Sequence, residues 1–145
     1  MRGLIQRVSR ANVTVEGEVV GEIGAGLLVL VGVTHDDGIA NADKLADKIR
    51  HLRVFDDADG TMNLSAADTD KPVLIVSQFT LYGDTRKGRR PSYVDAARPE
   101  VAEPLIERVV EQLRRAGLTV ATGKFRADMA VSLVNDGPVT LLVET

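Results

Sequence analysis

Two short stretches contain groups that could do chemistry. The first is SQFT, which follows the apolar run VLIV and comprises Ser77, Gln78, Phe79 and Thr80. It places hydroxyls, an amide and backbone N–H groups where a buried strand would end, and such donors can bind a developing oxyanion. The second is NDGPVT at 135–140, which contains Gly137 and Pro138 between two strand-like runs. NDGP is favourable turn chemistry, and a Gly-Pro pair can also present rigid backbone to a ligand without a side chain in the way.

A third stretch, TRKGRRPSY at 85–93, concentrates positive charge. Its cations are Arg86, Lys87, Arg89 and Arg90. The whole chain has a formal net charge of -3, so any affinity for nucleic acid has to come from such a local patch. A solvated loop would have the same composition, but the closeness of this loop to SQFT favours contact with a phosphate backbone.

Several familiar catalytic groups are missing from the sequence. The chain has no cysteine, which excludes a disulfide, a thiolate nucleophile and a sulfur-ligated metal. Its two histidines are His35, in the turn-like THDDG, and His51, in an amphipathic segment, and both fit a surface position. Neither a phosphate-binding GxxxxGK[ST] loop nor GxGxxG occurs. We therefore expect no metal and no cofactor.

Periodicity along the chain predicts the elements that carry these stretches. The segments are a hairpin at 13–23, a buried strand at 26–33, a helix within 39–54, a hairpin at 54–64, a strand over VLIVSQF, a helix near 100–116, and strands at 130–134 and 139–144 separated by NDGP. They predict an α/β fold of the α+β type, with a mostly antiparallel, curved or barrel-like sheet and two main helices packed outside it. The length predicts a single domain over residues 1–145.

The sequence also bears on location. The longest apolar run, at 26–33, is far shorter than the ~20 residues that span a bilayer. Arginines interrupt the N-terminal MRGLIQRVSR, so it lacks the apolar core of a secretory signal. We expect a cytoplasmic protein that does not associate with membranes.

Taken together, SQFTLYGD, RKGRRPSY, NDGPVT and the opening MRGLIQRV closely resemble the D-aminoacyl-tRNA deacylases, and TGKFRADM extends the likeness over essentially the whole chain. The resemblance implies a homodimer that hydrolyses the ester joining a D-amino acid to the terminal ribose of tRNA. It implies that SQFT forms the floor of the active site and that Gly137 and Pro138 of the other subunit lie over it and reject L-amino acids.

The same resemblance implies roles for three further residues. Arg7 would help to hold the Gly-Pro segment, and Phe125 and Met129 would line a pocket for the terminal adenine. Arg126 stands where the family usually has a small residue, so the resemblance does not determine the shape of that pocket.

The residues leave the attacking group and the function class open. Backbone N–H groups of 77–80 would bind the oxyanion, while the attacking group is either the Thr80 hydroxyl or a water assisted by the ribose 2′-OH. Because glycine has no side chain to reject, glycyl-tRNA would also be cleaved. The alternatives are an RNA- or DNA-binding dimer that uses 85–93 without turnover, and an esterase for free D-amino acid esters or peptides.

Overall fold

The computed structural model describes residues 1–145. Its elements, in chain order, are β1 (Arg2–Val15), β2 (Glu18–Ile23), β3 (Gly26–Gly32), α1 (Ile39–His51), β4 (Phe55–Asp56), β5 (Met62–Leu64), α2 (Ala66–Thr69), β6 (Val73–Ser77), the 3₁₀ turn η1 (Phe79–Tyr82), α3 (Pro99–Arg115), β7 (Val120–Thr122) and β8 (Ala130–Glu144). The two predicted helices and both predicted hairpins are confirmed. None of the helices has the length and apolar character needed to cross a membrane.

The main sheet has six strands and is mixed, which corrects the prediction of a mostly antiparallel sheet. Five strands follow the order β2-β1-β3-β6-β7, and β8 pairs with β1 along its other edge. The β1 pairings are antiparallel, whereas β3 with β6 and β6 with β7 are parallel. Parallel neighbours need a long crossover connection, and the chain supplies one through α1 and another through α3. The predicted helices are therefore what makes part of the sheet parallel.

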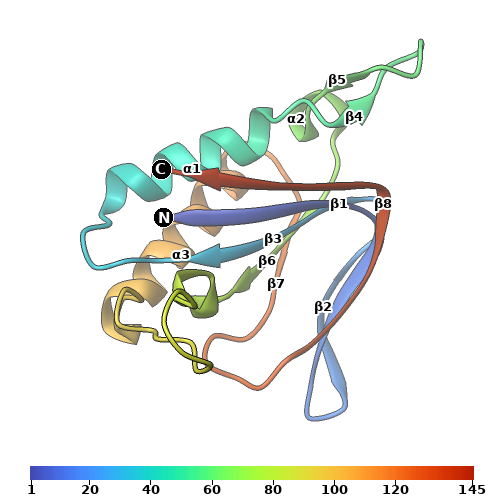
Figure 1. Cartoon of the computed structure of the whole chain (residues 1–145). Coiled ribbons are helices and arrows are strands. Elements are labelled where there is room, and N and C mark those ends of the chain that lie inside the picture. The colour runs from blue at the N-terminus through green and yellow to red at the C-terminus, as the bar shows by residue number, and fades with distance from the viewer.

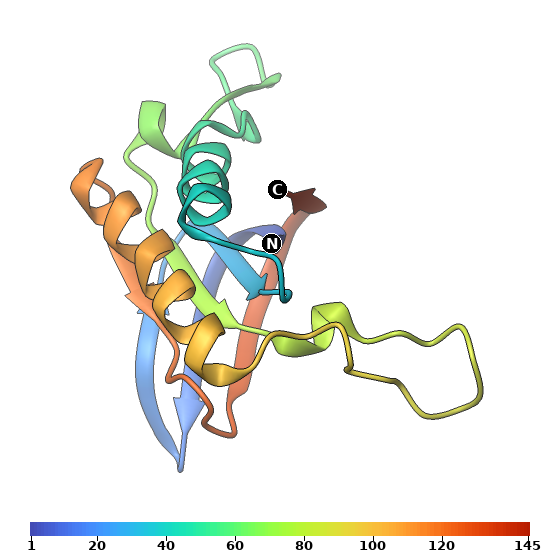
Figure 2. The ribbon, with the colours of Figure 1, turned by 90° about the vertical axis from the view of Figure 1, so that its left-hand side faces the viewer.

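Both long helices cover one face of the sheet (Figure 2). Their buried side chains recur at helical spacing: Ala42, Leu45, Ala46 and Ile49 in α1, and Ala102, Leu105, Val109, Val110 and Leu113 in α3. They pack on Leu27, Val29 and Val31 of β3 and on Val73 and Ile75 of β6. This is the larger of the two cores.

The intervening residues of the same strands form a second core on the opposite face. Leu28, Leu74 and Val76 alternate with the residues that face the helices, and they pack against Val8 and Val13 from β1. The sheet curves around this second core until β2 reaches β7, where a Cβ added at Gly21 would lie 2.3 Å from the carbonyl oxygen of Thr122. The curved, barrel-like shape that the sequence predicts is therefore present (Figure 1).

The C-terminal segment forms one strand instead of two strands joined by a turn, so the prediction of a turn at NDGP is wrong. Asn135 pairs with Val8 and Thr140 pairs with Gln6, so residues 136–139 bulge opposite the single residue Arg7. A turn would reverse the chain, whereas both halves of β8 continue along β1 and the extra residues bend the strand. Figure 1 shows β8 turning a corner.

The close approach of β2 to β7 can be tested at Gly21. We expect Gly21→Ala to lower the free energy of unfolding by about 1–3 kcal/mol, the usual range for overpacking, because the new methyl group meets backbone that cannot rotate away. Chemical denaturation followed by circular dichroism measures the change.

Gly24→Ala is the matched control, since a Cβ at Gly24 has no heavy atom within 4 Å. We expect this variant to be as stable as the parent chain. Equal stability of both variants would show that β2 does not close against β7 in solution.

Candidate functional site

The floor of the site forms where β6 loses its partner. Ser77 pairs with Val31, the Gln78 amide donates to the Val31 carbonyl at 2.8 Å, and β3 ends one residue later. Without a neighbouring strand to continue the ladder, the chain closes i→i+3 bonds instead, among them Leu81 N–H to the Gln78 carbonyl at 3.2 Å. The predicted strand over VLIVSQF therefore ends at Ser77, and Phe79 and Thr80 lie in the 3₁₀ turn η1.

A pocket of about 590 Å³ opens beside this floor. Most of its lining is hydrophobic, and the lining residues are Val31, Val33, Val76, Ser77, Gln78, Phe79, Tyr93, Ala96, Ala97, Pro99, Ala102, Ile106, Phe125, Arg126, Ala127, Met129 and Val131. The pocket thus contains three of the four SQFT residues together with Phe125 and Met129. A cavity of this size, apolar with a few polar groups at one end, has the usual form of a small-molecule site.

Two aromatic side chains meet at the pocket. The rings of Phe79 and Tyr93 lie 5.1 Å apart, edge to face at 73°. Both remain substantially exposed, which leaves apolar ring surface available beside the polar floor.

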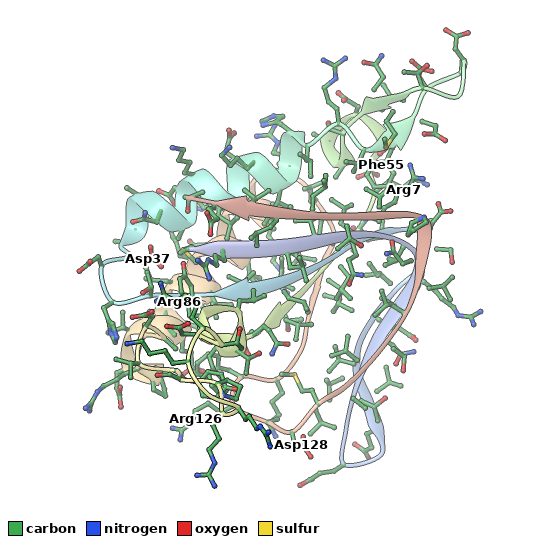
Figure 3. All side chains as sticks on the ribbon, in the orientation of Figure 1. Arg7, Asp37, Phe55, Arg86, Arg126 and Asp128 are labelled. Atoms are coloured by element: carbon green, nitrogen blue, oxygen red, sulfur yellow. The ribbon has the colours of Figure 1, made fainter.

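Arg126 also lines the pocket, and its φ of 64° places it in the left-handed region. Figure 3 shows Arg126 and Asp128 together at the end of the molecule opposite to Arg7. A long cationic side chain at the pocket makes this wall differ from one built with a small residue.

The Thr80 hydroxyl is held by an amide and has no base beside it. The Gln78 side-chain N–H donates to Thr80 Oγ1. His35 Nε2 is bonded to the Val94 carbonyl at 2.6 Å, and His51 Nδ1 lies 3.0 Å from Asp47 on α1. Each imidazole is therefore engaged elsewhere. No group of three or more potential metal-ligating side chains occurs in the structure.

The basic loop projects from the body as an arm, residues 84–92, between η1 and α3 (Figure 2). Two backbone hydrogen bonds between Asp84 and Ser92, 2.8 and 2.9 Å long, close its base. The Arg86 guanidinium binds the Asp84 carboxylate at 2.7 and 2.9 Å, and this hydrogen bonding lowers the pKa of Asp84 to about 2. Arg86 is therefore paired, whereas Lys87, Arg89 and Arg90 are exposed and have no ion-pair partner.

The Gly-Pro segment is held by Arg7, whose side chain is only 12% exposed. Arg7 Nε donates to the Asp136 carbonyl at 3.1 Å, and Nη1 donates to the Val54 carbonyl at 2.7 Å. The next peptide bond, Gly137-Pro138, is cis, and both of its residues are exposed. Figure 3 shows Arg7 beside Phe55, above the bend of β8.

Within one chain the Gly-Pro segment is remote from SQFT. Gly137 and Pro138 bulge opposite Arg7, which pairs with Leu27, and Leu27 pairs with Val73. The two segments are thus three strands apart and four residues apart in register, or about 14 Å across the sheet and about 13 Å along it. The structure brings the predicted floor and pocket residues together. It leaves Gly137 and Pro138, which were predicted to lie over the floor, on β8 at another edge of the sheet.

One wall of the pocket was not predicted from sequence. Ile106 belongs to the apolar stripe of α3 and has the sequence signal of a core residue, yet it is half-buried and lines the pocket. Ala96, Ala97 and Pro99 reach the pocket because the arm returns there. Small residues in a loop carry no pattern that would have marked them.

Comparisons with known proteins agree over the full length. The family described as D-Tyr-tRNA(Tyr) deacylase matches residues 4–144. D-aminoacyl-tRNA deacylases of Heliobacterium modesticaldum and Symbiobacterium thermophilum are 61% and 59% identical; the matches cover 99% and 100% of this chain and 96% of each relative.

Two solved structures are similar in fold. A c-Myc DNA unwinding element binding protein has a TM-score of 0.93 and 41% identity over 100% of this chain and 99% of its own. A probable eukaryotic D-amino acid tRNA deacylase has a TM-score of 0.87 over 99% and 98%, and at 18% identity it bears on the fold alone. From the family match and the identity to these relatives, the chain belongs to the D-Tyr-tRNA(Tyr) deacylase family, a family of hydrolases.

Proposed function

We propose that the protein hydrolyses the ester bond of D-aminoacyl-tRNA and releases the free D-amino acid and the tRNA. One observation supports this proposal above all: an apolar pocket, the polar SQFT floor and a cationic arm lie together on one side of the molecule. The chain also belongs to the matching family. The relatives that bear the name D-aminoacyl-tRNA deacylase match nearly all of the chain, which supports the same activity here.

The pocket and arm fit two parts of one substrate. A cavity of about 590 Å³ with Phe125, Met129 and Ile106 in its walls can enclose an adenine ring and its ribose. Lys87, Arg89 and Arg90 on the arm can contact phosphates of the same strand. An esterase for free D-amino acid esters or peptides would have no use for this arm.

Backbone N–H groups of the floor are the proposed oxyanion donors. Among the candidates, the Gln78 amide is bonded to the Val31 carbonyl and the Leu81 amide to the Gln78 carbonyl. We assign the role to the amides of Phe79 and Thr80, which lie between them. One such donor stabilises a transition state by about 3 kcal/mol, and an aminoacyl ester is already reactive enough for modest assistance to suffice.

The attacking group in this proposal is water. The Thr80 hydroxyl accepts a hydrogen bond from Gln78 and has no neighbouring base to remove its proton, so it is a poor nucleophile. Water attacks the ester carbonyl carbon, the bond from that carbon to the ribose 3′ oxygen breaks, and the 3′ oxygen takes up a proton. The neighbouring ribose 2′-OH is placed to help that proton transfer.

The Gly-Pro segment would complete the site from a second copy of the chain. It is exposed and remote from SQFT in its own chain, and the same strand carries the exposed apolar side chains Val134, Leu141 and Leu142. A rigid wall over the floor would collide with an L side chain and leave a D side chain free, which discriminates better than a small gain in affinity. Glycyl-tRNA would pass the same wall.

The first test measures tyrosine release from D-Tyr-tRNA and L-Tyr-tRNA with a chelator present and no added metal. We expect fast loss of the D ester and no enzyme-dependent loss of the L ester, because only the L side chain meets the wall. Binding of the tRNA without loss of either ester would contradict the proposed activity.

Mixing two variants extends this test to the shared site. Gly137→Val disrupts the segment proposed to cover the opposing site, because its φ of 127° disfavours a side chain and an added Cβ would lie 2.9 Å from Val139 Cγ2. Phe79→Pro removes a proposed oxyanion donor at a helix-start position that tolerates proline. Each alone should be inactive. After subunit exchange, we expect about a quarter of the parent activity, because half of the dimers are mixed and each has one intact site. No recovery would argue for sites built within one chain.

The choice of water over Thr80 makes a separate prediction. We expect Thr80→Ala to keep most of the single-turnover rate with D-Tyr-tRNA, since its hydroxyl does not attack. A substrate that ends in 2′-deoxyadenosine should react at least about tenfold more slowly, which is the low end of what positioned proton transfer contributes. A slow Thr80→Ala variant together with a fast deoxy substrate would instead identify Thr80 as the nucleophile.

Nucleic-acid binding without turnover is the second candidate function. The projecting arm supports it, as does the 41% identity to a protein whose name describes DNA binding. This candidate accounts for the arm but gives no use to the pocket and floor together. The two candidates differ in whether bound tRNA is turned over.

The arm can be tested through its salt dependence. We expect replacing its three unpaired cations by alanine to weaken tRNA binding and to reduce the slope of log affinity against log salt by about 2, since each cation that neutralises a phosphate of single-stranded RNA adds about 0.7 to that slope. Fluorescence anisotropy over a salt series measures the slope. The residues replaced are Lys87, Arg89 and Arg90.

The control removes the same charge from another surface. Arg10, Lys44 and Lys48 are exposed cations outside the arm. Their alanine variant should keep the parent slope. An equal reduction of the slope in both variants would mean that net charge, and not the arm, governs binding.

A further inference from the structure

The 3₁₀ turn η1 needs support that it cannot supply itself. None of its four residues is buried, and Phe79 is 56% exposed. Its own hydrogen bonds are those of a single turn, such as the 2.9 Å bond from the Gly83 amide to the Thr80 carbonyl. A turn without a fully buried residue has too little packing to fix its orientation, so contacts from other parts of the chain have to hold it.

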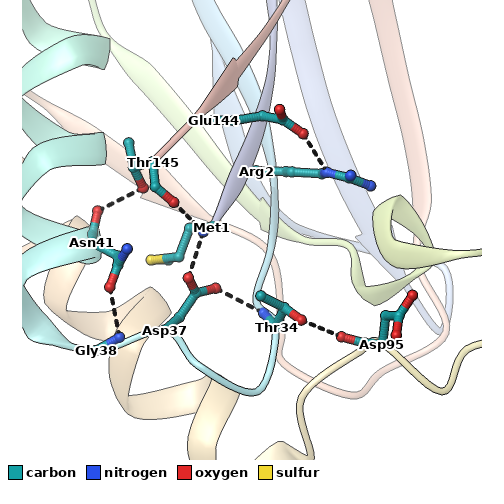
Figure 4. A network of polar contacts seen from close by, with 9 residues as sticks. All are labelled: Met1, Arg2, Thr34, Asp37, Gly38, Asn41, Asp95, Glu144 and Thr145. Atoms are coloured by element: carbon teal, nitrogen blue, oxygen red, sulfur yellow. Dashed lines mark hydrogen bonds and ion pairs between the residues drawn. The ribbon is translucent and has the colours of Figure 1, made fainter.

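Arg2 is the side chain that reaches this turn. Its Nη1 donates to the Leu81 carbonyl at 2.8 Å, and its guanidinium carbon lies 4.5 Å from the centre of the Tyr82 ring. Its Nε donates to Glu144 at 2.6 Å, as Figure 4 shows. One planar group therefore binds the carbonyl, the ring and the carboxylate at once.

The backbone around Arg2 is itself fixed. Arg2 pairs with Gly32 on one side and Glu144 on the other. The Met1 amino group donates to Asp37 at 2.7 Å and to the Thr145 carbonyl at 2.9 Å (Figure 4). The backbone of Arg2 is thus held on both sides, so its side chain can fix the position of the less rigid turn η1.

Gly32 provides the room for this contact. A Cβ at Gly32 would lie 3.1 Å from the Gln78 carbonyl oxygen and 3.1 Å from Leu81 Cβ. The turn therefore rests directly on the β3 backbone, with Arg2 holding its far end. Burial raises the pKa of Tyr82 to about 12, with Asp37 adding to the rise and the Arg2 cation opposing it, so the ring stays neutral beneath the guanidinium at physiological pH.

We propose that Arg2 is a positioning residue for ester hydrolysis: by holding Leu81 and Tyr82, it keeps the amides of Phe79 and Thr80 aimed at the ester carbonyl. This inference rests on the proposed function. Lysine cannot replace arginine here, because a single ammonium group cannot bind Leu81 and Glu144 while stacking on the ring.

The test compares Arg2→Met and Arg2→Lys with the parent chain in the hydrolysis of D-Tyr-tRNA. We expect kcat to fall about tenfold or more in Arg2→Met, since displacement of a catalytic group by ~1 Å can cost on the order of 100-fold. KM should stay within about twofold, because the arm and the pocket walls outside η1 are intact. Arg2→Lys should recover less than half of the lost rate.

A spectroscopic measurement follows the turn itself. The chain has only two tyrosines, Tyr82 and Tyr93, so tyrosine-labelled protein gives two ring signals in NMR spectra. We expect both signals to shift in both Arg2 variants: Tyr82 loses the guanidinium above its ring, and Tyr93 packs on Phe79 of the displaced turn. An unshifted Tyr82 signal would overturn the contact on which the inference rests.

Arg108→Met is the matched control. Arg108 is also partly exposed and binds a carboxylate, Asp43, at 2.7 Å, but it joins α3 to α1. The Arg108→Met variant should lower thermal stability as much as Arg2→Met does, without changing kcat. A kcat for Arg2→Met equal to that of the parent or of Arg108→Met would overturn the inference while the proposed function stands. An inactive parent chain would instead remove the proposed function.

Discussion

The antiparallel ladder along β1 is the constraint on which the rest of the structure depends. β1 pairs with β8 along one edge and with β3 and then β2 along the other. Its buried residues enter the two cores: Ile5 lies under the helices, and Val8 and, beyond the register shift at residues 8–10, Val13 lie on the opposite face. Because a register slip of one residue would exchange the two faces, the apolar pattern holds every neighbouring strand in place.

The same register places two arginines where they hold the two candidate functional segments. Arg2 binds the carbonyl of Leu81 in the turn that contains Phe79 and Thr80, and Arg7 binds the carbonyl of Asp136, which precedes Gly137. The two arginines are five positions apart, which corresponds to about 16 Å along the strand. The turn η1 and the Gly-Pro segment, neither of which has a buried core, are thereby fixed in position relative to one rigid strand, β1.

The proposed chemistry depends on backbone and position more than on reactive side chains. Both histidines are engaged away from Thr80, so the floor offers amides and not a general base. Such a site is sensitive to the orientation of a short turn, because a hydrogen-bond donor stabilises charge only when it points at the place where that charge develops. In the proposed chemistry, the contacts that hold η1 would therefore matter to function without touching the substrate.

Patterns within the sequence were sufficient to predict the local elements and the family. Gly17, with φ of 80°, allows the tight turn of the first hairpin, and helical spacing marks α1 and α3, because these patterns depend on near neighbours. The tertiary structure decided the parallel strand pairs, the end of β6 at Ser77, the bulge at Gly137 and the contact of Arg2 with η1. Each of these depends on which distant strand lies alongside: β3 ends beside Gln78, and β1 continues past residues 136–139. Local pattern cannot encode such pairings, because they form between segments that meet only when the sheet is assembled.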